Sequence, residues 1–126
     1  MITIINGITD GFIGTNKIYI GRYNSRYNLN ENPLHNPYKI SKDKGIDRKM
    51  AIELYRRYLW ESIKRFRDDK PLDRIAVELI NIARVEKETG FVKLVCFCNP
   101  LPCHGDVVIS AIEWLKDQDW FVDNWL

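Results

Sequence analysis

The feature that most constrains the fold is a nearly continuous apolar run near the C-terminal end of the chain, Phe91–Cys98 (FVKLVCFC). A short apolar run of this kind is typical of a strand that is buried on both faces. Gly90 precedes the run and the turn sequence Asn-Pro-Leu-Pro follows it, so residues that interrupt regular structure mark both ends. The run therefore predicts the central strand of a sheet that other elements cover.

Two shorter strands are expected near the N-terminus. Thr3–Asn6 (TIIN) is a short β-branched run, and Lys17–Arg22 (KIYIGR) is a second run that ends in Gly-Arg. Between them, Gly7–Asn16 carries three glycines and is expected to form turns.

Three helices are expected in the remainder of the chain. Asp47 is a good N-cap for the first helix. Pro71 suits the first position of the second helix, which Gly90 ends. The third helix is expected over Cys103–Lys116. Apolar residues at helical spacing mark the buried faces, namely Met50, Ala51, Leu54, Tyr58, Leu59, Ile63 and Phe66, then Ile75, Leu79, Ile82 and Ala83, and then Val107, Val108, Ala111, Ile112 and Leu115.

The order of these elements predicts an α/β fold. Strands separated by helices favour a small Rossmann-like sheet, largely parallel, with helices packed on it. The length of 126 residues fits one domain over residues 1–126. Trp120, Phe121 and Trp125 in the tail are expected to pack on this domain, although an aromatic tail also leaves homo-oligomerisation open.

Composition excludes several classes of protein. The net charge of +2 is too small and too scattered to favour nucleic-acid binding. No apolar run approaches the roughly 20 residues of a membrane span, and the N-terminus does not resemble a secretory signal. Three cysteines without such a signal indicate reduced thiols, so we expect a cytoplasmic protein without membrane contact.

All three cysteines and one of the two histidines fall in the segment CFCNPLPCHGD, for which three interpretations remain open. In the first, Cys96 and Cys98 are small apolar residues of the core. In the second, they bind zinc together with Cys103 and His104, although this spacing differs from the usual pairs of zinc ligands. In the third, the segment forms a ligand-binding or catalytic site at the start of a helix.

The third interpretation gives each residue of the helix start a role. Unpaired N–H groups there favour anions and lower the pKa of a thiol. Gly105 would let a phosphate or carboxylate approach the backbone. Cys103 is then a candidate nucleophile, and His104 and Asp106 are candidate acid and base. Asp106 also has a second interpretation as a purely structural residue, because an acidic residue in the first turn stabilises a helix without any further role.

A second group of candidates follows the strand that ends near Gly21. Arg22 suits contact with a phosphate or carboxylate, and Asn36-Pro37-Tyr38 lies in a long polar loop, Tyr23–Lys44, of a length that is often functional. Ligands of parallel sheets bind beyond the carboxyl ends of the strands. We therefore expect the Arg22 tip and the Cys103 corner to meet in one electropositive pocket. The predicted ligand-binding residues are Gly21, Arg22, Asn36, Pro37, Tyr38, Cys98, Asn99, Pro100, Cys103, His104, Gly105 and Asp106.

Four segments give the chain a resemblance to a known family. They are the strand IYIGR, the element His35-Asn36-Pro37-Tyr38, the helical segment YRRYLW and above all the signature C-x-C-x-x-x-P-C-H-G-D. From Lys17 to Leu115 it resembles domain of unknown function 4326, a family of small proteins from bacteria and their phages. The resemblance locates a site without naming an activity, and it implies a phage setting in which small proteins sequester nucleotide signals.

The sequence thus leads to one main hypothesis and two alternatives. The main hypothesis is a protein that binds a small anionic ligand of the nucleotide or ADP-ribose type, with no cofactor and no metal. The first alternative is a Cys/His-dependent enzyme acting on a nucleoside or nucleotide. The second is a zinc-stabilised interaction domain.

Overall fold

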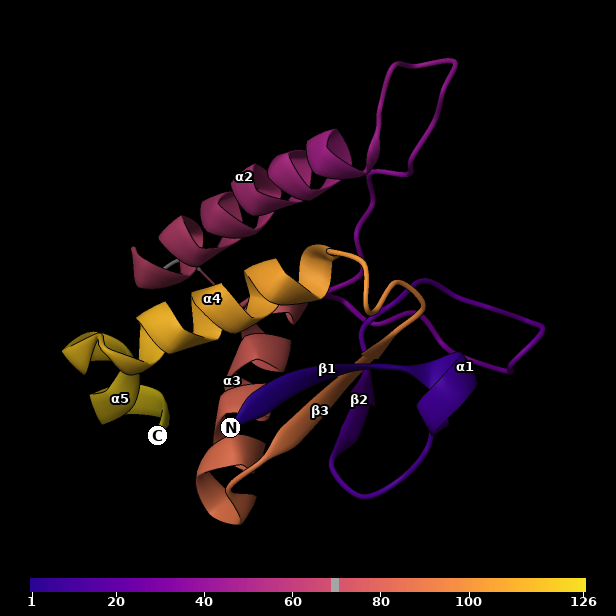
Figure 1. Cartoon of the computed structure of the whole chain (residues 1–126). Coiled ribbons are helices and arrows are strands. Elements are labelled where there is room, and N and C mark those ends of the chain that lie inside the picture. The colour runs from indigo at the N-terminus through magenta and orange to yellow at the C-terminus, as the bar shows by residue number, and fades with distance from the viewer. Residues whose placement is uncertain (69–70) are drawn as a thin grey trace.

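Three parallel strands form one sheet in the computed structural model, which describes residues 1–68 and 71–126. The strands are β1 (Ile2–Asn6), β2 (Lys17–Tyr19) and β3 (Val92–Cys96), and their order in the sheet is β1-β3-β2 (Figure 1). The register pairs Ile4 and Ile18 with the same residue of β3, Leu94. The predicted α/β class and the central position of the apolar strand are confirmed.

Five helices accompany the sheet within the described residues. They are α1 (Gly7–Asp10), α2 (Arg48–Arg67), α3 (Arg74–Thr89), α4 (His104–Lys116) and α5 (Asp119–Trp125). None of the described helices is both long and apolar enough to cross a membrane.

The helix ends follow local capping chemistry. The Asp47 carboxylate accepts the Met50 N–H at 2.8 Å, as predicted for the N-cap of α2. Gly90 ends α3 in the left-handed conformation, with φ of 90°, which was also predicted. The predicted start of α3 at Pro71 was wrong, because the Asp73 carboxylate accepts the Ala76 N–H and makes Arg74 the first helical residue.

Several predicted boundaries were also wrong. β2 ends at Tyr19 and β3 at Cys96, so both strands are shorter than predicted. The segment expected to form only turns contains α1, and the tail forms α5. Met50, expected on the buried face of α2, has an exposed side chain.

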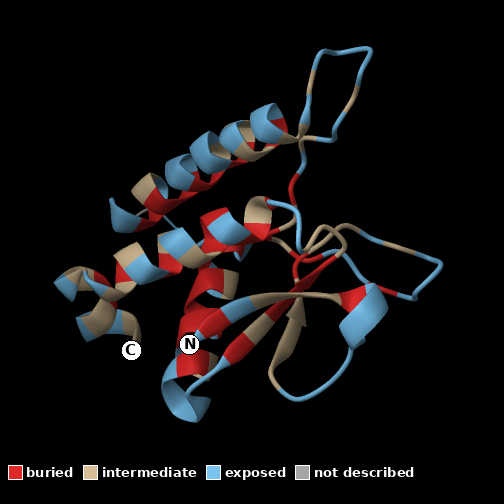
Figure 2. Ribbon diagram, viewed as in Figure 1, coloured by how far each residue is buried: buried red, intermediate tan, exposed pale blue. Residues whose placement is uncertain are grey.

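The two faces of the sheet are covered differently. One face, which includes Ile4, Leu94 and Cys96, packs against the helices, whose buried residues turn toward it (Figure 2). The other face carries Val95, which is fully buried, and a cluster of aromatic rings. The rings of this cluster lie 5.0 to 6.0 Å apart between centroids and belong to Phe12, Tyr19, Tyr27 and Phe97. Burial of the central strand on both faces is therefore confirmed.

The far ends of α2 and α4 meet the C-terminal segment. Phe121 is fully buried. The Phe66 ring contacts the rings of Trp120, Phe121 and Trp125, at centroid distances of 5.3, 6.0 and 5.8 Å. The expectation that the aromatic tail packs on the rest of the chain is confirmed.

Candidate functional site

The carboxyl ends of the three parallel strands lie at one edge of the sheet, where the chain leaves β2 and β3 toward the long loop and toward α4 (Figure 1). Just beyond β2, the Ile20 N–H donates to the Val95 carbonyl at 3.1 Å. The Ile20 carbonyl in turn lies 2.7 Å from His104 Nε2, in the first residue of α4. The Arg22 tip and the Cys103 corner therefore meet, as the sequence predicted.

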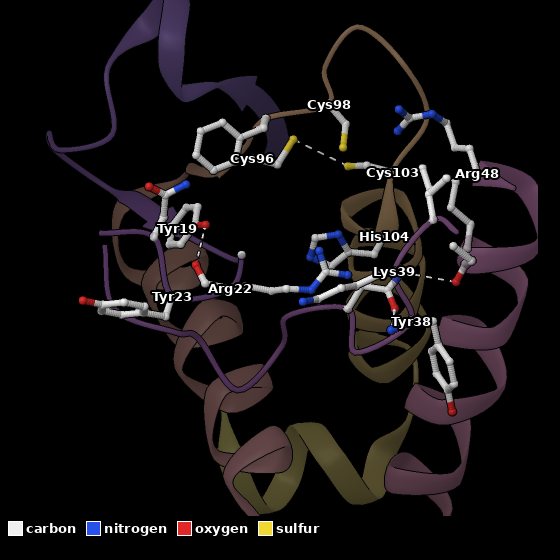
Figure 3. A pocket seen from close by; sticks show the side chains of 17 residues that line it. Tyr19, Arg22, Tyr23, Tyr38, Lys39, Arg48, Cys96, Cys98, Cys103 and His104 are labelled. Atoms are coloured by element: carbon white, nitrogen blue, oxygen red, sulfur yellow. Dashed lines mark hydrogen bonds between the residues drawn. The ribbon is translucent and has the colours of Figure 1, made fainter. Parts of the chain in front are cut away.

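A cavity of about 580 Å³ opens at this junction (Figure 3). Its walls come from the tip of β2, the long loop, the first turns of α2, the end of β3 and the start of α4. The residues that line it are Tyr19, Gly21, Arg22, Tyr23, Asn24, Asn36, Tyr38, Lys39, Ile40, Arg48, Ala51, Ile52, Cys96, Phe97, Cys98, Cys103 and His104. Pro37, Asn99, Pro100, Gly105 and Asp106, which were predicted to contact a ligand, are not part of this lining.

Arg22 is the most unusual residue of the cavity. Its Nε is buried and has no hydrogen-bond partner within the described structure. Buried polar atoms are almost always paired, and leaving one unpaired costs about 1–3 kcal/mol. The Arg22 backbone is fixed, because its carbonyl accepts the Tyr19 hydroxyl at 2.7 Å. The fold therefore holds a guanidinium at the cavity without supplying a partner for its Nε.

Two further cations line the cavity. Arg48 begins α2 and donates from Nη1 to the Pro102 carbonyl at 3.2 Å, which ties α2 to the segment before α4. Lys39 comes from the long loop. No aspartate or glutamate is among the lining residues in the described parts of the chain. The cavity is therefore electropositive and suited to an anionic ligand.

His104 is held neutral within the cavity wall. A carbonyl can only accept, so Nε2 carries the proton that is donated to Ile20 and Nδ1 retains a lone pair. Burial lowers the pKa of His104, which the hydrogen bond to Ile20 only partly opposes. The Tyr55 ring packs edge-on against the imidazole at 5.1 Å and fixes its plane.

The long loop before α2 is anchored by its own asparagines and by a buried tyrosine. Asn36 donates from Nδ2 to the Ala51 carbonyl at 3.2 Å and accepts the Tyr38 N–H at 2.9 Å. The Tyr55 hydroxyl donates to the Leu34 carbonyl at 2.7 Å. Asn36 lines the cavity, but both ends of its amide hold the loop in place, so its main part is to position Tyr38.

The start of α4 is capped by its own side chains. Cys103 is the N-cap, and its Sγ accepts the Gly105 N–H at 3.3 Å. The Asp106 carboxylate accepts the Cys103 N–H at 3.1 Å and completes a capping box. A Cβ on Gly105 would lie 3.0 Å from Ile4 Cδ1 and 3.1 Å from Ile20 Cδ1. The structure thus gives Gly105 a role in packing α4 on the sheet, where an opening for a phosphate was expected. Asp106 stabilises the first turn of the helix, as its second interpretation expected.

The turn between β3 and α4 is also fixed from β1. Asn6 donates from Nδ2 to the Asn99 carbonyl at 2.9 Å and to the Phe97 carbonyl at 3.2 Å. The Asn99–Pro100 peptide bond is cis. These two predicted site residues shape the turn that carries the cysteines.

The three thiols lie close together beside this turn. The Sγ atoms of Cys96 and Cys103 are 3.6 Å apart, and each residue is only 3% exposed. Cys98 is partly exposed and lines the cavity. Hydrogen bonding from the Cys103 and Cys96 thiols lowers the pKa of Cys98, and Arg48 lowers it further. The same contacts and burial raise the pKa of Cys103, so the thiol predicted to be the nucleophile is the protonated partner.

The packing and zinc interpretations of the cysteines can be compared with this geometry. Both Cys96 and Cys98 line the cavity, but Cys96 is buried in the core, as the packing interpretation expected, whereas Cys98 is only partly buried. Within residues 1–68 and 71–126, no group of three or more histidine, cysteine, aspartate or glutamate side chains is arranged to hold a metal ion.

Sequence reasoning missed five polar residues of the lining, namely Tyr19, Tyr23, Asn24, Lys39 and Arg48. One of them carried a signal. Arg48 is a cation in the first turn of a helix, where the helix dipole disfavours positive charge. A residue that violates a local rule in this way is often one that serves a site.

Comparisons with known proteins agree with the sequence resemblance. A family model described as a domain of unknown function (DUF4326) matches residues 9–114. A relative from Enterobacteria phage T4, called uncharacterized 12.4 kDa protein in nrdA-td intergenic region, is 31% identical over 85 residues. That match covers 68% of this chain and 66% of the relative, so the chain spans just under two thirds of the relative's length. No solved structure matches the chain. The chain belongs to the DUF4326 family.

Proposed function

We propose that the cavity binds a small anionic ligand of the nucleotide or ADP-ribose type. The observation that carries the proposal is the buried, unpaired Nε of Arg22 at a cavity with two more cations and no lining carboxylate in the described residues. An anionic oxygen of the ligand would supply the missing partner. Hydrogen bonds that involve a charged group contribute about 1.5–3 kcal/mol, which corresponds to a factor of roughly 10 to 100 or more in affinity.

The dimensions and lining of the cavity fit this class of ligand. Small-molecule sites range over about 300–1,000 Å³, and the cavity volume of about 580 Å³ lies within that range. The rings of Tyr23 and Tyr38 offer surfaces for a base or a sugar. The lone pair of His104 Nδ1 can accept a hydrogen bond from a hydroxyl or an amino group. Phosphate would be bound by the cations and the uncharged part of the ligand by these side chains.

The proposal is one of binding without turnover. Two of the three residues expected to perform catalysis are engaged elsewhere, since the Cys103 thiol is buried and Asp106 caps α4, and His104 alone keeps a free ring nitrogen at the cavity. The phage relative supports a setting in the cytoplasm of a bacterial host, where cysteines stay reduced. In that setting the protein would sequester a nucleotide signal.

Calorimetric titration tests the proposal with inorganic phosphate, AMP, ADP, ADP-ribose and uncharged adenosine as probes. We expect ADP-ribose or a nucleotide to bind and adenosine to bind at least about tenfold more weakly, because one charged contact is worth more than the 1.4 kcal/mol of a tenfold change. Raising the salt concentration should weaken binding of the charged probes only.

Two variants make the test specific. Arg22→Gln should weaken binding by about 10- to 100-fold, in line with the loss of a charged hydrogen bond. Arg57→Gln is the matched control, because Arg57 is exposed on α2 and does not line the cavity. The proposal is wrong if no probe binds, or if both variants bind as the unmodified protein does.

A further inference from the structure

The cavity contains an arrangement of thiols that anion binding does not require. Cys96 ends β3 and Cys103 caps α4, and the turn between them brings their sulfur atoms to 3.6 Å. Both are buried, and the Cys103 sulfur already accepts the Gly105 N–H. These two thiols therefore lie side by side, and in their protonated form they can donate to the neighbouring Cys98 sulfur.

Cys98 differs from its two neighbours in exposure and in its surroundings. It follows β3, lines the cavity and is partly exposed. Arg48 extends toward it from the start of α2 (Figure 3), and its positive charge helps to lower the pKa of the Cys98 thiol. A thiol that has access to solvent and lies beside a guanidinium and two thiol donors has the surroundings typical of a reactive cysteine, because these contacts stabilise the thiolate.

We propose that Cys98 is a covalent modification site, at which its thiolate exchanges with small anionic disulfides that enter the cavity. In this step the Cys98 sulfur attacks one sulfur of the disulfide, and the disulfide bond breaks as a new S–S bond forms to Cys98. The other sulfur leaves as a thiolate and takes a proton from water. The Cys98 sulfur is oxidised and the departing sulfur is reduced, so the disulfide is the oxidant.

The assignment to Cys98 rests on access, and the preference for an anionic disulfide rests on charge. Cys96 and Cys103 are 3% exposed, so a disulfide reaches neither without local opening. The lowered pKa of Cys98 and the raised pKa of Cys103 also favour Cys98 as the thiol that reacts. Arg22, Lys39 and Arg48 around the cavity attract the carboxylates of a disulfide such as glutathione disulfide.

A mixed disulfide at Cys98 would also fill the cavity. The proposal goes beyond the proposed function and holds whether or not a nucleotide binds, since it needs only the thiols and the cations. If both proposals hold, the adduct and a bound nucleotide exclude one another.

The reaction with glutathione disulfide, followed by intact-protein and peptide mass spectrometry without any nucleotide, tests the proposal. We expect one adduct, located on Cys98, and no adduct on Cys98→Ser. Cys103→Ser keeps an accessible Cys98 and should still form it. Arg48→Gln should slow the reaction by about threefold or more, whereas Arg57→Gln, which changes an equally charged residue of α2 outside the cavity, should not.

Two further measurements decide the chemistry and the charge preference. Between about pH 8 and pH 6 the rate at Cys98 should fall far less than the roughly 100-fold expected of an ordinary thiol with a pKa of about 8.5. The neutral disulfide of mercaptoethanol should react more slowly than glutathione disulfide at low salt. A first adduct on Cys96 or Cys103, or a pH dependence like that of an ordinary thiol, would overturn the assignment to Cys98, and equal rates with both disulfides would overturn the anionic preference. Neither result bears on nucleotide binding, which is measured separately.

Discussion

The two ends of the helical layer differ in how well their buried groups are paired and packed. At the far end, Phe66, Trp120, Phe121 and Trp125 pack ring against ring and leave Phe121 fully buried. At the end near the strand tips, Arg22 holds an unpaired buried nitrogen beside a cavity. The first end gains stability from burial, while the second accepts a cost that a ligand could offset. A local cost of this kind is a physical reason to look for function there.

The largest effect is expected at the aromatic end. Phe121→Ala should lower the free energy of unfolding by about 3–5 kcal/mol, because it removes a buried ring and leaves a void that the neighbouring rings cannot fill. Urea unfolding measures this change. If the ends are independent, the affinity for ADP-ribose at a temperature where the variant is folded should stay the same. A large loss of affinity in the folded variant would break the comparison.

The next effect is expected where the loop meets α2. Tyr55→Phe removes the hydroxyl that donates to the Leu34 carbonyl and leaves that buried carbonyl unpaired, which should cost about 1–3 kcal/mol of stability. Because this bond anchors the loop that carries Tyr38, ligand affinity should also fall. Tyr58→Phe is the control and should change stability by less than about 0.5 kcal/mol. An effect of Tyr55→Phe below about 0.5 kcal/mol would mean that the Tyr55 hydroxyl does not stabilise the loop.

Arg22→Met should have the opposite sign at the cavity end. The substitution removes an unpaired buried nitrogen and keeps an apolar side chain of similar reach, so the free energy of unfolding should stay the same or rise by up to about 1 kcal/mol. Ligand affinity should fall at the same time. A clear loss of stability in Arg22→Met would show that the guanidinium has a structural partner and would remove the main argument for a ligand.

A smaller effect is expected from the cap of α4. Asp106→Ala removes the carboxylate that accepts the Cys103 N–H and should cost about 0.5–1 kcal/mol of stability. The affinity for the ligand should be unchanged, because Asp106 does not line the cavity. Asp106→Asn should recover part of the stability. A loss of affinity without a loss of stability would return Asp106 to the binding site.

The smallest effect is a dependence of stability on pH. Burial lowers the pKa of His104 in the folded state, so unfolded chains bind a proton more readily than folded ones below about pH 6.5. The contribution of the neutral imidazole is therefore present above that pH and is lost as the pH falls through the lower folded pKa. The difference between the urea midpoints of the unmodified chain and of His104→Gln should be constant above about pH 6.5 and should shrink as the pH falls below it. Parallel curves would contradict a buried neutral His104.

The sequence predicted those parts of the fold that depend on local pattern. Continuous apolarity identified the central strand, helical spacing identified the buried faces of α2 and α4, and Asp47 and Gly90 marked helix ends. The start of α3 was missed because Pro71 and Asp73 both suit a helix start, and only Asp73 makes the capping bond. Short elements such as α1 and α5 were missed because their patterns are too brief to stand out.

The site was predictable where it follows from sheet geometry. Parallel strands place their carboxyl ends together, so the meeting of Arg22 with the Cys103 corner could be inferred. The contribution of Lys39 depends on how the long loop folds back over that edge, which no local pattern encodes, whereas the unfavourable position of Arg48 in the first turn of α2 was a signal in the sequence. The roles of Gly105 and Asp106 could not be decided for a related reason, since both residues fit a ligand cradle and a packed, capped helix start equally well in sequence.

The comparison between the two ends is tested most directly by a heteronuclear NMR titration of the labelled protein with ADP-ribose. We predict that shifted amide signals cluster on the residues around the cavity, including Gly21, Arg22, Tyr38 and His104, and that those of α5 stay in place. No shifts at saturating concentrations, or shifts centred on Phe121 and the aromatic end, would contradict the account.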